Sequence, residues 1–118
     1  MINELIGRTF ATRNAAHLEH WRTKSFAAHD ALGIFYDALL DALDPIVEAH
    51  QGVFKLVSVG DMAKQPKVTN IIEHLEEDLV WINKNRKTIT SGLPAIDNML
   101  QTLEGEYMSA LYKLKRLS

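Results

Sequence analysis

Between residues 26 and 50, apolar side chains recur every three or four residues. This spacing places them on one face of an α-helix, and the run is too long for an ordinary strand. Ser25 precedes the run and suits a helix N-cap, while Gly52 suits a helix end. The apolar face comprises Leu32, Phe35, Tyr36, Leu39, Leu40, Leu43, Ile46 and Val47. We therefore expect a long amphipathic helix from Phe26 to His50.

Three further segments carry the same helical period. The first runs from Ile2 to near Lys24, the next follows Pro66 and ends at Gly92, and the last begins at Pro94. Residues 53–65 alternate only weakly and contain Gly60 and Asp61, so we expect a long connection there with one short helical turn. No pair of strands is indicated. The chain is therefore expected to be an all-α four-helix bundle of two antiparallel hairpins, with a long connection between helices two and three, which is the ferritin-like arrangement.

Composition narrows the chemistry. The 118 residues suit one domain, residues 1–118, and are 47% hydrophobic and 24% charged. Thirteen Lys and Arg against 15 Asp and Glu give a net charge of −2, which provides no broad field for attracting phosphates. There is no cysteine, no phosphate-binding glycine loop and no G-x-S-x-G motif. No apolar run approaches the roughly 20 residues of a membrane span, so we expect a cytoplasmic protein without a membrane partner, whose chemistry uses His and carboxylates.

Five acidic residues form a stripe on the predicted helix 26–50. At roughly 100° per residue they fall within an arc of about 60° beside the apolar face. The five are Asp30, Asp37, Asp41, Asp44 and Glu48. Such acids repel one another unless water screens them or cations neutralise them, so the stripe is either a solvated face or part of a cation site.

Two histidines favour the cation site. His20 ends the first predicted helix and His29 begins the second. Fifteen helical residues separate His29 from Asp44 by about 22 Å, so the two cannot share an ion within one chain. Antiparallel packing of this helix against its own copy would bring His20 and His29 to Asp44 and Glu48 of the second copy. Mixed His and carboxylate ligands suit iron, manganese or zinc, and we predict these four residues as the metal-binding and catalytic set.

The arrangement of His20-Trp21, His29, Asp44 and Glu48 resembles that of Dps, the DNA-binding protein from starved cells, a miniferritin. Residues 92–114, GLPAIDNMLQTLEGEYMSALYKL, are similar to the turn and last helix of that family. The resemblance implies a ferroxidase that oxidises Fe(II) with peroxide or dioxygen at a site shared between subunits. It also implies storage of ferric iron inside a hollow dodecamer.

Several positions depart from the family. An acidic ligand usual one turn after the second histidine is replaced by Gly33, and Pro45 is expected to kink the helix beside Asp44. The N-terminal residues MINELIGR lack a lysine-rich extension, so DNA binding is not carried over. We interpret His17 as filling the bundle face, and His50 and His74 as surface or helix-end residues.

These departures keep alternatives open. One is a non-enzymatic ferritin-like bundle that self-associates without turnover. Another is a DNA-compacting oligomer in which each subunit makes a weak basic contact through Lys84, Arg86 and Lys87.

Overall fold

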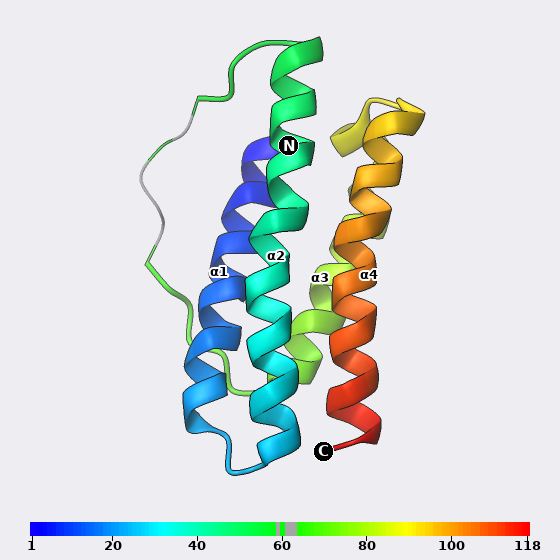
Figure 1. The fold of residues 1–118 in the computed structure, drawn as a ribbon. Coiled ribbons are helices and arrows are strands. Elements are labelled where there is room, and N and C mark those ends of the chain that lie inside the picture. The colour runs from blue at the N-terminus through cyan, green and yellow to red at the C-terminus, as the bar shows by residue number, and fades with distance from the viewer. Residues whose placement is uncertain (59, 61–63) are drawn as a thin grey trace.

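The computed structural model describes residues 1–58, 60 and 64–118 (Figure 1). These residues form four helices: α1 (Ile2–Arg22), α2 (Phe26–Val53), α3 (Ile71–Thr90) and α4 (Pro94–Arg116). No strand occurs among the described residues. The predicted all-α four-helix bundle is confirmed. Across the same part of the chain, none of the helices combines the length and the apolar character needed to cross a membrane.

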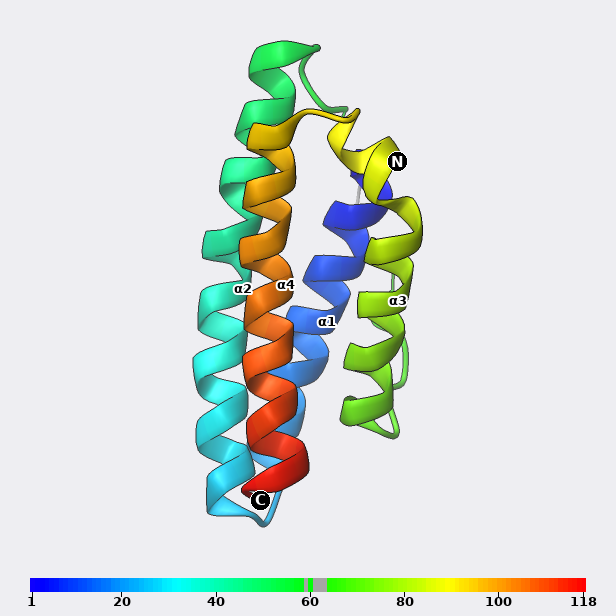
Figure 2. The same ribbon diagram turned by 90° about the vertical axis from the view of Figure 1, so that its right-hand side faces the viewer.

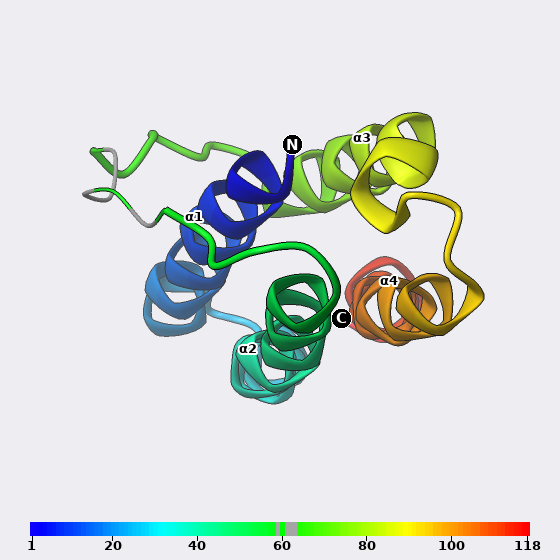
Figure 3. The same ribbon diagram turned by 90° about the horizontal axis from the view of Figure 1, so that it is seen from above.

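The helices occupy the four corners of the bundle, as Figure 3 shows from above. α1 packs against α2 and α3, and α4 packs against the same two helices. The members of each packed pair run in opposite directions (Figures 1 and 2). α2 ends and α3 begins at opposite ends of the bundle. Part of the segment 53–65, for which we predict a long connection with one short helical turn, lies outside the described residues, so this turn stays a prediction.

Side-chain caps fix where two of the helices begin. The Ser25 hydroxyl accepts a hydrogen bond from the Ala28 amide at 3.1 Å, as expected for an N-cap. The predicted start of α3 after Pro66 is wrong, because the Asn70 side chain caps the helix and accepts from the Glu73 amide at 3.1 Å. α3 therefore starts at Ile71 and leaves residues 64–70 as an irregular segment.

A turn with two left-handed residues separates α3 from α4. Ser91 has φ 52° and Gly92 has φ 74°, and Pro94 then occupies the first turn of α4. This compact turn keeps α3 and α4 side by side and antiparallel.

The core fills the space between the four helices and contains no charged residue from α2. The apolar face predicted for α2 is largely confirmed, since Leu32, Phe35, Leu39, Leu43 and Ile46 are buried. The α4 positions Ile96, Leu100, Leu103, Tyr107, Leu111 and Leu114 are buried as well. The opposite face of α2 is consequently left on the outside of the bundle, where it carries the acidic stripe.

Candidate metal-binding site

The α1–α2 corner holds two histidines in one fixed arrangement. His20 lies in the last turn of α1 and His29 in the first turn of α2. Their rings stack with centroids 3.7 Å apart and planes 16° apart. His20 Nδ1 lies 2.6 Å from the His29 carbonyl oxygen, and His29 Nδ1 lies 2.7 Å from the His20 carbonyl oxygen. Each side chain thus holds the backbone of the other.

These reciprocal bonds determine which ring nitrogen is available. A carbonyl oxygen only accepts, so each Nδ1 carries a hydrogen and donates. In the neutral ring, Nε2 then bears the lone pair. Among the described residues, no hydrogen bond reaches Nε2 of either ring. A backbone carbonyl that binds one ring nitrogen and so orients the other is a common support for metal-ligating histidines.

Gly33 accommodates the ring of His20 against α2. A Cβ atom at position 33 would lie 3.0 Å from His20 Cε1 and 3.3 Å from His20 Nδ1, which is tighter than ordinary contact. A larger side chain at this position would therefore require the His20 ring to shift. In this protein, the imidazole occupies the space that such a side chain would need.

An aromatic stack continues from the pair along α1. His17 stacks on Tyr36 with ring centroids 4.0 Å apart, and the rings of Tyr36 and His20 meet edge to face with centroids 5.4 Å apart. His17 is partly exposed on this surface and does not fill the bundle interior as expected. Loss of hydration lowers the pKa of His17, as do the neighbouring Arg13 and His20, while Asp37 acts in the opposite direction. His17 is therefore held toward its neutral form.

Asp44 and Glu48 lie apart from the histidine pair. Both are exposed, and so are the other three acids of the stripe. No group of three His, Asp or Glu side chains able to hold a metal ion occurs within the described part of one chain. A metal site that includes His20 or His29 and has three or more protein ligands therefore needs a ligand from outside this copy. α2 continues through Pro45, and the kink expected there stays a prediction.

Comparison with known proteins gives a family without an assigned function. A family described as "Family of unknown function (DUF5856)" matches residues 20–114. The chain belongs to DUF5856. No curated protein and no solved structure matches it. The matched region includes His20, His29, Asp44 and Glu48, and the likeness to Dps stays a prediction.

This DUF5856 protein also has a buried polar centre that our sequence analysis did not predict. Asp78 on α3 is 2% exposed. Its carboxylate accepts hydrogen bonds from Thr12 on α1, from the Tyr107 hydroxyl on α4 at 2.8 Å, and from Arg8 at 3.3 Å. Burial, together with the Asp78 charge, raises the pKa of Tyr107 well above its ordinary value. The centre ties α3 to α1 and α4.

A periodic signal for this centre is present in the sequence. Asp78 lies three residues after Leu75 and four before Ile82, both of which are buried, so it falls on the apolar face of α3. Thr12 holds the corresponding place on α1, four residues before Ala16. Polar residues at such positions indicate a buried hydrogen-bonded group, although the donors come from other helices and cannot be named from one segment.

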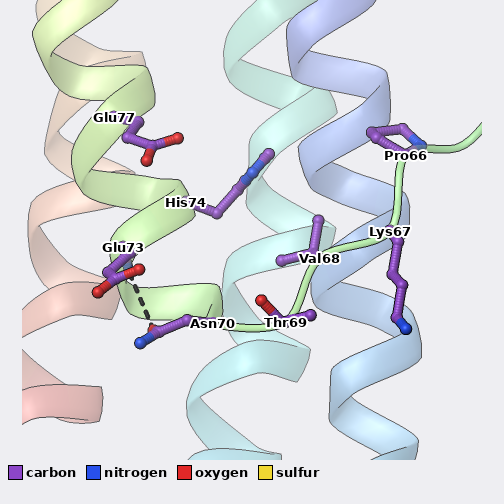
Figure 4. Close-up of a pocket in the computed structure, with 8 residues that line it drawn as sticks. All are labelled: Pro66, Lys67, Val68, Thr69, Asn70, Glu73, His74 and Glu77. Atoms are coloured by element: carbon purple, nitrogen blue, oxygen red, sulfur yellow. Dashed lines mark hydrogen bonds between the residues drawn. The ribbon is translucent and has the colours of Figure 1, made fainter.

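His74 stands at the outer edge of this centre. It was expected at the surface and is partly exposed, and its Nε2 lies 2.8 Å from the Thr12 hydroxyl. Because Thr12 donates its hydrogen to Asp78, His74 must donate from Nε2. Figure 4 shows a hollow beside this ring, lined by Asn70, Glu73 and Glu77 among others. His74 points toward α1 while Glu73 points away from it, so these side chains do not gather around one point.

The side chain of Arg86 forms ion pairs within the DUF5856 bundle. It forms ion pairs with Asp97 and Glu104 of α4, and Glu104 is buried. The hydrogen bond that Arg86 donates to the Glu104 carboxylate is the main cause that raises the pKa of Arg86. Of the three basic residues considered for nucleic acid, only Lys84 and Lys87 are exposed. The basic surface considered for DNA compaction therefore consists of Lys84 and Lys87 without Arg86.

Proposed function

We propose that this protein binds Fe(II) at a site shared between two copies and oxidises it with peroxide or dioxygen, keeping the ferric product soluble. The histidine pair is the observation that carries the proposal. Both Nδ1 atoms donate hydrogen bonds to backbone carbonyls. Both Nε2 lone pairs are thereby oriented and available to a metal ion at the surface of the bundle. Neutral imidazole is a suitable ligand for iron, and for zinc or manganese in its place.

Asp44 and Glu48 of the second copy supply the oxygen ligands in this proposal. They lie one helical turn apart on the outer face of α2, so both carboxylates can reach one ion. No ion pair within the described residues engages either of them. Two carboxylates add negative charge, which favours Fe(III) over Fe(II) and so promotes oxidation.

The stacking of the rings supports two ions. A nitrogen lone pair lies in the plane of its imidazole, and two nearly parallel planes do not converge on one ion. Each ring therefore serves its own ion. Two Fe(II) ions give up one electron each, and peroxide accepts both electrons while its O–O bond breaks and two protons are taken up to form two waters.

The test follows Fe(II) oxidation after anaerobic addition of peroxide. Wild type is compared with Glu48→Ala, with Glu77→Ala and with a protein-free control. Glu77 is the matched control because it is an exposed helical glutamate on α3, far along the chain from the stripe. We expect rapid oxidation with soluble product in wild type and Glu77→Ala, and loss to the protein-free rate in Glu48→Ala. Identical traces in all four samples would contradict the proposal.

A second candidate is a non-enzymatic bundle that self-associates without oxidising iron. The packing of His20 against Gly33 favours it, because the ring fills the place where Dps proteins usually carry an acidic ligand. In that case the histidine pair serves only to join α1 to α2. Self-association with no peroxide-dependent oxidation above the control would select this candidate.

A further inference from the structure

The outer face of α2 carries acidic residues and no lysine or arginine. α2 carries five acids and contains no lysine or arginine. All five acids are exposed, and the ion pairs of the described residues include none of them. No ion pair of the described residues therefore neutralises this face, and α2 stands at a corner of the bundle (Figure 3).

Bulky apolar side chains lie exposed at both ends of the same helix. Phe26 begins α2 and is 82% exposed. At the other end, Val53 and Phe54 are exposed, and Leu56 just beyond is 80% exposed. Exposure of these apolar side chains to water is unfavourable. Antiparallel pairing of two copies of α2 brings the N-terminal end of one copy beside the C-terminal end of the other.

One antiparallel register brings the exposed apolar ends close together and also places the histidine pair beside acids of the second copy. If His29 lies opposite Glu48 of the second copy, Phe26 lies opposite Gln51, about one turn from Phe54. The two-fold axis then passes between Ala38 and Leu39. Asp37 and Asp41 of both copies consequently lie within about one helical turn of the axis.

The acids near the axis oppose this pairing when no cation is present. Four carboxylates, two from each copy, face one another there without a basic residue on either helix. Like charges brought out of water repel strongly, and divalent cations relieve that repulsion. We propose that two copies associate through the outer faces of α2 in this register and that divalent cations control the association. This inference rests on the proposed function, because it makes the shared iron site a product of cation-driven pairing.

Sedimentation velocity of the full chain tests the inference. Wild type is measured in EDTA, in Mn(II), and in NaCl at the ionic strength of the Mn(II) sample. We expect a monomer in EDTA and in NaCl and a dimer in Mn(II). A monomer in all three, or the same dimer in EDTA as in Mn(II), would overturn the inference.

Three variants identify the surface. Asp37→Asn with Asp41→Asn should dimerise more than wild type in EDTA, because the repulsion at the axis is removed. Phe26→Ser should weaken the Mn(II)-dependent dimer at least about tenfold, since a large apolar contact is lost in each copy. Tyr112→Ser is the matched control, an exposed aromatic on α4, and should leave the dimer unchanged. Equal effects of Phe26→Ser and Tyr112→Ser would place the contact elsewhere and overturn the register.

The two proposals fail separately. A Mn(II)-dependent dimer that oxidises no Fe(II) would refute the ferroxidase function and support the cation-controlled surface. Glu48-dependent oxidation by a protein that sediments as a monomer would refute the surface and the sharing of the site between copies, and would retain only the iron-oxidising activity.

Discussion

At the scale of single residues, Gly33 leaves room for the ring of His20 against α2. A glycine inside a helix normally costs about 1 kcal/mol relative to alanine, so Gly33→Ala would stabilise the fold if nothing else changed. The new Cβ would instead meet His20 Cε1 at 3.0 Å. We expect Gly33→Ala to gain little or no stability and to disturb the Nδ1–H signals of His20 and His29 in NMR spectra.

Gly105 provides the control for this substitution. It lies within α4, and a Cβ there would meet nothing within 4 Å. Gly105→Ala should raise the free energy of unfolding by roughly 0.5–1 kcal/mol without affecting the histidine signals. If both variants gain the same stability and the histidine signals stay unchanged, Gly33 does not position His20.

At the scale of elements, Asp78 holds α3 to its neighbours. Asp78→Ala would leave the buried hydroxyls of Thr12 and Tyr107 without their acceptor. An unsatisfied buried donor costs about 1–3 kcal/mol, so we expect urea unfolding to show a loss of about 3 kcal/mol or more. Glu77→Ala, at the adjacent exposed position, should change stability by less than about 0.5 kcal/mol. Similar losses in the two variants would show that the Asp78 contacts contribute nothing specific.

The elements themselves were largely predictable because their signals are local. Ser25 and Pro94 mark the starts of α2 and α4, and apolar spacing gives their buried faces. The start of α3 was misplaced because Pro66 gives a stronger signal than Asn70, whose capping bond depends on how the chain enters the helix. The Asp78 centre was not predicted because its donors come from α1 and α4, and only the packed bundle brings them together.

The candidate site was predictable in residue type but not in geometry. The position of His20 and His29 at one helix corner follows from the helix boundaries. Their stacking and reciprocal bonds depend on the closeness of α1 to Gly33, which no local pattern encodes. The joining of this pair to Asp44 and Glu48 depends on a second copy and stays a prediction.

At the scale of the whole molecule, the buried Tyr107 links stability to alkaline pH. Its pKa is raised well above 10 in the folded state, mainly by burial, while in the unfolded chain it titrates near 10. The stabilising effect of keeping the hydroxyl protonated is therefore complete below about pH 10 and is lost as pH rises toward the folded pKa. Wild type should lose free energy of unfolding steeply above pH 10, measured by urea titration at each pH.

Substitution isolates this tyrosine from the lysines that titrate in the same range. Tyr107→Phe should lower stability at neutral pH by about 1–3 kcal/mol, because Asp78 loses a buried donor. The same variant should lose less stability than wild type between pH 10 and pH 11, since it has no buried hydroxyl to ionise. Tyr112→Phe, at an exposed position, should follow the wild-type curve. Parallel curves for all three proteins would mean that the Tyr107 hydroxyl does not couple folding to pH, and the Asp78 centre would then hold the bundle through Thr12 and Arg8 alone.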